Sequence, residues 1–96
     1  MCYALEPRYD SRASFYGKAL VEETRNSKEQ VQDLYSYGTL VARIITDFEK
    51  SERTFECYGK YSCTTTRHQK EFFKQNMLSD KEIKELFETG VFKYEL

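Results

Sequence analysis

The sequence predicts an α+β fold in which a small antiparallel sheet of three strands, arranged as a bent meander, is followed by two C-terminal helices packed on one face. Two patterns predict this class. Residues 14–58 are rich in β-branched and aromatic side chains that alternate with polar ones, as in half-buried strands. Residues 66–90 place apolar side chains three and four positions apart behind helix-start signals. Because 96 residues support one core, we expect a single domain over residues 1–96, with 1–13 as a loosely ordered lead-in.

Three segments account for the predicted sheet. Residues 14–23 alternate as a first strand, in which Gly17 indicates a bulge or a close backbone approach. Residues 31–48 are too long for one flat strand, so we expect a bend or bulge at Gly38 to carry the chain onward. Residues 54–58 alternate again and form the third strand.

The first helix is predicted to begin at a threonine. Thr66 and Gln69 have the spacing of a capping box, in which each side chain accepts a hydrogen bond from the other residue's backbone N–H. Phe72, Phe73 and Met77 then supply an apolar stripe. We expect this stripe to cover one face of the sheet.

The second helix has stronger boundary signals. Ser79 and Glu82 form a second capping box, and the apolar residues after them recur with helical spacing. Gly90 is predicted to end the helix, because glycine readily adopts the left-handed conformation found there. The tail, residues 91–94, is expected to dock on the core as a short extended piece.

Composition and charge limit the function classes. The chain has a formal net charge of −1 and a sequence pI near 5.9, so it lacks the protein-wide basic field typical of nucleic-acid binders. No apolar run approaches the roughly 18 residues that span a bilayer, and the first residues show no basic segment followed by an apolar core. We therefore expect a cytoplasmic protein.

The cysteines and the histidine together predict a possible structural zinc site. Cys2, Cys57, Cys63 and His68 are all the Cys and His residues of the chain, and they would satisfy a tetrahedral Cys3His set. Such a site would stabilise a small core and leave no open position for a substrate. In the alternative interpretation, Cys57 and Cys63 are small core residues and Cys2 is an exposed thiol, because five residues between two cysteines exceed the usual two-to-four-residue spacing.

A set of tyrosines with nearby cations predicts the partner-binding surface. Rigid aromatic rings with polar tips and cationic groups contribute much of the energy of protein interfaces. The same combination stacks bases in sheet-based binders of single-stranded nucleic acid, which is the alternative interpretation. The predicted contact residues are Tyr35, Tyr37, Tyr58, Lys60, Tyr61 and Arg67.

The sequence predicts no enzyme. A nucleophilic pair of Cys63 and His68 would need an environment that stabilises the thiolate and an oxyanion site, and neither is visible. The three threonines at positions 64–66 offer hydroxyls at a helix start, where a phosphate or carboxylate binds in other proteins, but capping of the helix explains them more simply. We therefore expect function through binding.

Two segments carry a resemblance to a known family. Residues 34–42 (LYSYGTLVA) and 61–72 (YSCTTTRHQKEF) contain a Ser-Tyr-x-Thr-x-Val-Ala strand and a Tyr-Ser-x-Thr-Thr-x-Arg-His turn into a helix. This combination resembles a family of small uncharacterised proteins of phages and mobile elements of Gram-positive bacteria. The resemblance implies a protein that binds and inhibits a host protein or ribonucleoprotein, with an anti-CRISPR or other anti-defence role in the cytoplasm of a bacterial host. The family pattern does not include Cys2, Cys57 or Cys63, so a metal role lies outside it.

Overall fold

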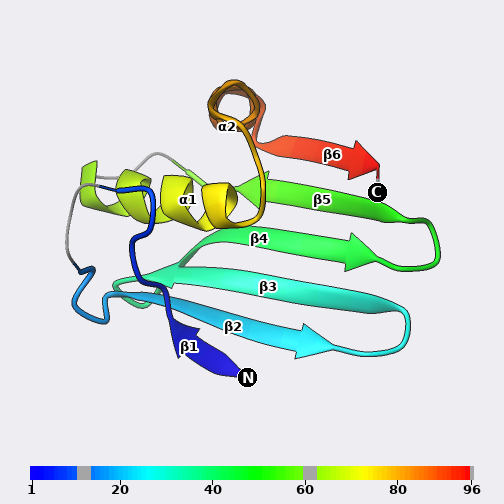
Figure 1. Cartoon of the computed structure of the whole chain (residues 1–96), viewed down its shortest axis with the longest axis horizontal. Helices are drawn as coiled ribbons and strands as arrows, with labels where there is room; N and C mark the ends of the chain where they lie inside the picture. Colours follow the sequence, from blue (N-terminus) through cyan, green and yellow to red (C-terminus); the bar gives the residue numbers. More distant parts are fainter. Residues whose placement is uncertain (11–13, 60–62, 96) are drawn as a thin grey trace.

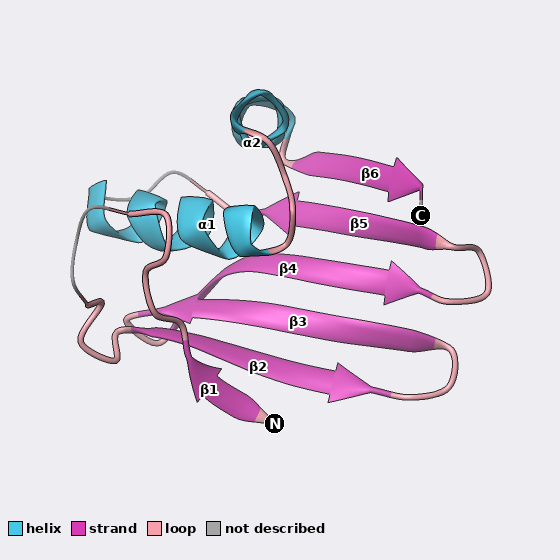
Figure 2. Ribbon diagram, viewed as in Figure 1, coloured by secondary structure: helices cyan, strands magenta, loops and turns pink. Residues whose placement is uncertain are grey.

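The computed structural model describes residues 1–10, 14–59 and 63–95, so Lys60 and Tyr61 lie outside the described part. Within it, the chain forms a six-stranded antiparallel sheet with two helices over one face (Figures 1 and 2). The strands lie in the sheet in the order in which they occur in the chain. The elements are β1 (Cys2–Ala4), β2 (Ala19–Arg25), β3 (Glu29–Ser36), β4 (Thr39–Asp47), β5 (Glu52–Cys57), α1 (Cys63–Gln75), α2 (Asp80–Thr89) and β6 (Val91–Glu95).

The α+β class is confirmed, but the prediction of three strands is wrong. Residues 31–48 form two strands instead of one bent strand, because Tyr37 and Gly38 both take positive φ angles, 52° and 81°, and reverse the chain tightly. An irregularity does interrupt the pairing of β3 with β4, but it lies between Leu34 and Tyr35. The two ends of the chain supply the remaining strands, β1 and β6.

The sheet has an inner face toward the helices and an outer face away from them. Cross-strand partners share a face, and residues alternate between faces along each strand. The inner face carries Val21, Leu34, Ile44 and Phe55, all at most 1% exposed, and Phe55 packs edge-on against Phe73 of α1. The apolar core therefore lies between this face and the two helices.

Helix α1 is fixed to the rest of the fold by buried polar side chains. The Gln69 side-chain amide donates to the carbonyl of Val41, which lies at the irregularity of β4, over 2.9 Å. One carboxylate oxygen of Glu71, a residue that is only 2% exposed, accepts from the backbone N–H groups of Tyr9 and Asp10 at 2.8 and 3.1 Å. These bonds hold the first ten residues against the helix.

The start of α1 differs from the prediction. The helix begins at Cys63, so Thr66 lies inside it and cannot act as the N-cap. Met77 follows the end of the helix with a φ of 74° and is 83% exposed, which removes it from the predicted apolar stripe. Polar side chains take most of the buried positions that an all-apolar stripe would have filled: Thr65, His68, Gln69 and Glu71, beside Phe72 and Phe73.

The boundaries of α2 are confirmed. The Ser79 hydroxyl accepts from the Glu82 backbone N–H at 3.2 Å, and the Glu82 carboxylate accepts from the Ser79 N–H at 2.9 Å. Gly90 has a φ of 84° and donates its N–H to the Leu86 carbonyl. No helix in the described residues is long and apolar enough to cross a membrane.

The buried Glu71 carboxylate should be important for stability. Replacement of Glu71 by Ala leaves two backbone N–H groups of the first ten residues without an acceptor, and each lost bond to a charged group costs about 1.5–3 kcal/mol. We expect the free energy of unfolding in urea to fall by about 3–6 kcal/mol. The matched control is Glu85→Ala, at an exposed position of α2, which should change the stability by less than about 0.5 kcal/mol. An equal effect of both variants would contradict this role of Glu71.

Candidate functional site

The tyrosines predicted to bind a partner do not share one surface. Tyr35 and Tyr58 lie on the outer face of the sheet, whereas Tyr37 occupies the β3–β4 turn on the helix side, next to the ring of His68. Arg67 also lies on the helix side, where its guanidinium donates to the Asp10 carboxylate at 3.1 Å. The fold therefore creates two separate candidate surfaces where the sequence predicted one.

The outer face of the sheet is open and carries apolar side chains. The register places Leu20, Tyr35 and Leu40 opposite one another on three neighbouring strands. Val31 lies opposite Ile45, four residues from Tyr35 along β3 and five from Leu40 along β4. Leu20 is 39% exposed, and the other four are partly exposed. No described element covers these side chains (Figure 2). This face therefore offers apolar and aromatic area to a partner.

An ion pair lies between these two rows of apolar side chains, the row of Leu20, Tyr35 and Leu40 and the row of Val31 and Ile45. The Arg43 guanidinium donates two hydrogen bonds to the Asp33 carboxylate, at 2.6 and 3.3 Å. The Tyr58 hydroxyl donates to the Glu56 carboxylate at 2.8 Å. Burial, and then this bond to Glu56, raises the pKa of Tyr58 to about 12, so the phenol stays protonated. These hydrogen bonds therefore hold the polar side chains at the centre of the outer face in place before a partner binds.

Negative charge dominates the outer face. One row places carboxylates on four neighbouring strands, although like charges directly opposite one another destabilise a sheet. Among the described residues, the cations on this face are Arg43 and Lys93. The row consists of Glu29, Asp47, Glu52 and Glu95. The other carboxylates on this face are Glu22, Asp33 and Glu56.

On the helix side, a hollow lies between two turns of the same kind. Tyr16 and Gly17 form one turn with φ angles of 54° and 71°, and Tyr37 and Gly38 form the other. The Tyr37 N–H donates to the Lys18 carbonyl at 2.9 Å, so the two turns are bonded side by side. The hollow measures about 360 Å³ and is lined by Ser14, Phe15, Tyr16, Lys18, Tyr37, Thr64 and His68.

His68 forms the floor of this hollow and is 1% exposed. Its Nδ1 lies 2.8 Å from the Ser36 hydroxyl, which in turn lies 3.1 Å from the Thr65 hydroxyl. The Phe15 ring packs on the imidazole with centroids 4.5 Å apart. Burial lowers the pKa of His68, and the charge of Asp10 opposes that shift more weakly, so the ring is neutral at pH 7.

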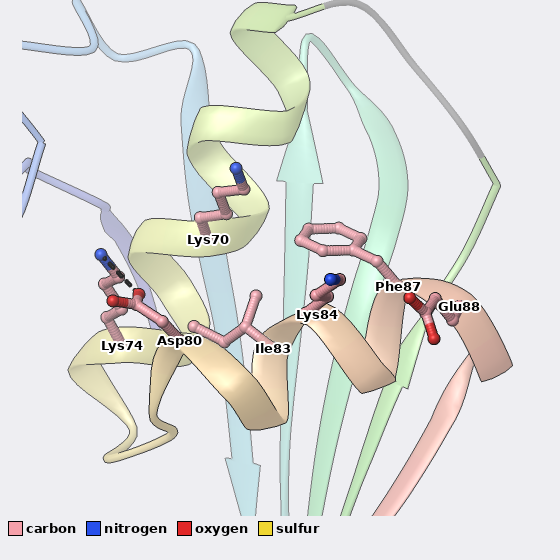
Figure 3. Close-up of a pocket in the computed structure, with 7 residues that line it drawn as sticks. All are labelled: Lys70, Lys74, Asp80, Ile83, Lys84, Phe87 and Glu88. Carbon is pink, nitrogen blue, oxygen red and sulfur yellow. Dashed lines mark ion pairs between the residues drawn. The ribbon is translucent and has the colours of Figure 1, made fainter.

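Another hollow, of about 680 Å³, lies in the groove between α1 and α2 (Figure 3). Ile83 and Phe87 point into it from α2, and the Phe87 ring also packs against Phe73 of the core at 6.2 Å. The Lys74 ammonium pairs with the Asp80 carboxylate at 3.0 Å. The remaining charged lining residues are Lys70, Lys84 and Glu88. Because both signs of charge line the groove, its electrostatics select no particular partner.

The predicted zinc ligands do not come together. Cys2 lies on the outer face of β1 and Cys57 on the inner face of β5, four strands or about 19 Å away. Burial raises the pKa of Cys57 to about 11, which disfavours the thiolate that zinc requires. The imidazole of His68 already bonds Ser36. The described residues contain no group of three or more Cys, His, Asp or Glu side chains placed to hold a metal ion.

Cys63 and His68 do not form a nucleophilic pair either. They are five residues apart on α1, so their side chains point about 140° apart around the helix axis. Sequence reasoning missed Tyr16 and Lys18 as lining residues of the hollow, and Ser36 as the hydrogen-bond partner of His68. The repeated Tyr-Gly dipeptides at positions 16–17 and 37–38 could have indicated the two turns beside the hollow, since glycine is typical of tight turns.

Residues 3–89 match the model of a family of unknown function, DUF8033. The chain belongs to this family. No curated protein and no solved structure matches the chain. A function for this DUF8033 member is therefore inferred from the geometry of its surfaces.

His68 should make the stability of this protein depend on pH. Its pKa is lowered in the folded state, so the unfolded chain, with a pKa near 6.5, binds the proton more readily. This contribution is complete above about pH 6.5 and is lost as the pH falls through that value. We expect urea denaturation to show a decline in the free energy of unfolding between pH 7.5 and 5.5.

The variant His68→Gln provides the control for this measurement. His68 is the only histidine of the chain, so the variant should be less stable at pH 7.5 but should show almost no change in stability down to pH 5.5. A wild-type protein whose stability is as flat as that of the variant over this range would contradict the buried, neutral state of His68.

Proposed function

We propose that this protein acts by binding rather than by catalysis, and that the open outer face of its sheet captures a protein with a basic surface. The observation that supports this proposal is the combination of apolar rows with an excess of carboxylates on that face. Apolar and aromatic area supplies the affinity, while complementary charge speeds the encounter and selects the partner.

The charge of the outer face favours a protein partner over a nucleic acid. Tyr35 and Tyr58 are the two tyrosines of the predicted base-stacking set that lie on this face, but Tyr58 is bonded to Glu56 and its pKa is also affected by Asp33. Phosphate groups would be repelled by this surface, because binding of single strands requires cations along the backbone. A lysine- or arginine-rich protein surface meets the opposite condition.

The dimensions of the protein agree with an interface of standard size. The molecule measures 37 × 29 × 22 Å. Its broad face is therefore large enough to supply the roughly 800 Å² of surface that each partner contributes to such an interface. A partner of this kind would cover most of the outer face. Covering a functional surface needs no chemistry, so binding alone is sufficient for inhibition.

The biological setting that we propose is inhibition of a host macromolecule by a phage or mobile-element protein. Host proteins and ribonucleoproteins that handle nucleic acid expose basic surfaces, and an acidic face would compete for them. An anti-CRISPR or other anti-defence role is one case of such competition. Protection of a phage from a defended bacterial host when this protein is expressed, and loss of that protection in outer-face variants, is the corresponding biological assay.

Charge reversal on the outer face should abolish this binding. We expect the double variant Glu22→Lys/Glu29→Lys to bind a synthetic basic amphipathic peptide at least about tenfold more weakly, because each exposed carboxylate becomes repulsive. The matched control, Glu85→Lys/Glu88→Lys on α2, changes the net charge equally and should alter the dissociation constant by less than about twofold.

The measurement is an NMR titration that also maps the contact. Backbone shifts of the wild-type protein should concentrate on β2, β3 and β4. Equal weakening by both double variants would reveal non-specific attraction between charges, and shifts confined to α1 and α2 would move the partner to the other side; either result overturns the proposal. Binding to single-stranded oligonucleotides that weakens steeply with salt would favour the nucleic-acid alternative.

A further inference from the structure

The two turns at the His68 hollow contain the wrong residue for their backbone conformation. A first turn position with positive φ is normally taken by Asn, Asp or Gly, yet here Tyr16 and Tyr37 both occupy it. Their side chains are 78% and 58% exposed, so burial in the core does not account for them. Strain of this kind collects at binding sites, where the side chain is needed for a contact outside the fold.

The floor of the hollow presents an unused polar atom. Nδ1 of His68 is bonded to Ser36, but among the hydrogen bonds of the described residues none reaches Nε2, although the residue is almost completely buried. Among the described residues, no side-chain nitrogen or oxygen atom that is sealed from solvent lacks a partner, so the unbonded Nε2 is reachable from the hollow. A ligand in the hollow can take the place of solvent as the hydrogen-bond partner of Nε2.

The charge of the hollow is positive. Lys18 is the charged residue of its lining, and Thr64 belongs to the first turn of α1, whose backbone N–H groups favour an anion. Asp10, whose charge acts on the pKa of His68, is paired with Arg67, and the Glu6 carboxylate accepts from the Ser14 hydroxyl of the lining at 3.4 Å. The walls are aromatic, because Phe15 and Tyr37 pack on the imidazole and Tyr16 also lines the hollow.

We infer that this hollow binds a planar ring that carries an anionic group, the chemistry of a nucleotide, with the ring held between the tyrosines over His68 and the phosphate at Lys18. The volume of about 360 Å³ lies in the range of small-ligand sites, roughly 300–1,000 Å³. The site lies on the helix side and uses none of the outer-face residues, so its failure and that of the proposed protein interface are separate results.

Titration with defined probes tests the site. The probes are AMP, UMP, adenosine and inorganic phosphate, each followed by the NMR signals of His68 and of the two turns. Since the ring and the anion are held by different groups, we expect AMP and UMP to bind at least about tenfold more tightly than adenosine or phosphate. A 5′-phosphorylated tetranucleotide compared with AMP shows whether the natural source is a strand end or a free nucleotide, and tighter binding of either supports the site.

The tyrosine variants separate a ligand role from a structural one. Tyr16→Asn and Tyr37→Asn place a residue that tolerates positive φ in each turn, so the melting temperature should stay unchanged or rise while the AMP affinity falls about tenfold. Lys18→Met should reduce the affinity for AMP to about that for adenosine. Tyr94→Asn, at an exposed position of β6, is the matched control and should bind AMP normally.

Three results would overturn the inference. One is the absence of saturable shifts with AMP or UMP up to about 10 mM, which corresponds to less than 3 kcal/mol of binding free energy. Another is unchanged AMP affinity in both asparagine variants. The third is a marked drop in melting temperature for both variants, which would assign the tyrosines to the fold.

Discussion

The fold depends on how helix α1 is held on the sheet. About one turn of this helix buries three polar side chains, and each bonds a different part of the chain: His68 bonds β3, Gln69 bonds β4, and Glu71 bonds residues 9 and 10. An apolar stripe would allow the helix to slide or rotate at little cost, whereas these bonds require one position because a buried polar group without a partner is expensive. The same bonds place His68 at the floor of its hollow.

This fixed position gives the protein two unlike sides. The helices cover the inner face of the sheet, so the outer face has no covering element among the described residues and carries the acidic and apolar rows (Figure 2). The helix side instead gathers the cations of α1 and the aromatic turns. The net charge of only −1 therefore does not show that one face is strongly negative. The net charge sums both sides of the molecule, whereas a partner contacts only one side.

The sequence predicted the features that depend on local rules. The capping box of Ser79 and the terminating Gly90 require only neighbouring residues, and both are present. The number of strands was missed because it depends on Tyr37 adopting a conformation that tyrosine disfavours, and on the pairing of β1 and β6 with strands far away in the chain. Periodicity cannot reveal such long-range pairing.

The candidate site was harder to predict for a related reason. Alternation along a strand shows that two tyrosines two positions apart share a face, which would place Tyr35 and Tyr37 together. The tight turn after Ser36 breaks that alternation and sends Tyr37 to the helix side, while Tyr35 stays on the outer face. His68 was singled out from the sequence as a candidate zinc ligand, but its partner Ser36 is 32 positions away, and no local pattern connects them.

The structure retains local conflicts that stability alone would remove. Each tyrosine with positive φ costs about 1–2 kcal/mol, and each pair of opposed carboxylates costs up to about 1 kcal/mol. Asp47 has a compensating role, since it accepts from the backbone N–H groups of Glu49 and Lys50 in the following turn. Glu52 and Glu95, which continue its row, have no such bond among the described residues. Small domains have a margin of only about 5–15 kcal/mol, so these conflicts consume a considerable part of it. They lie on the two surfaces for which we propose binding, where contact with a partner or ligand would offset their cost.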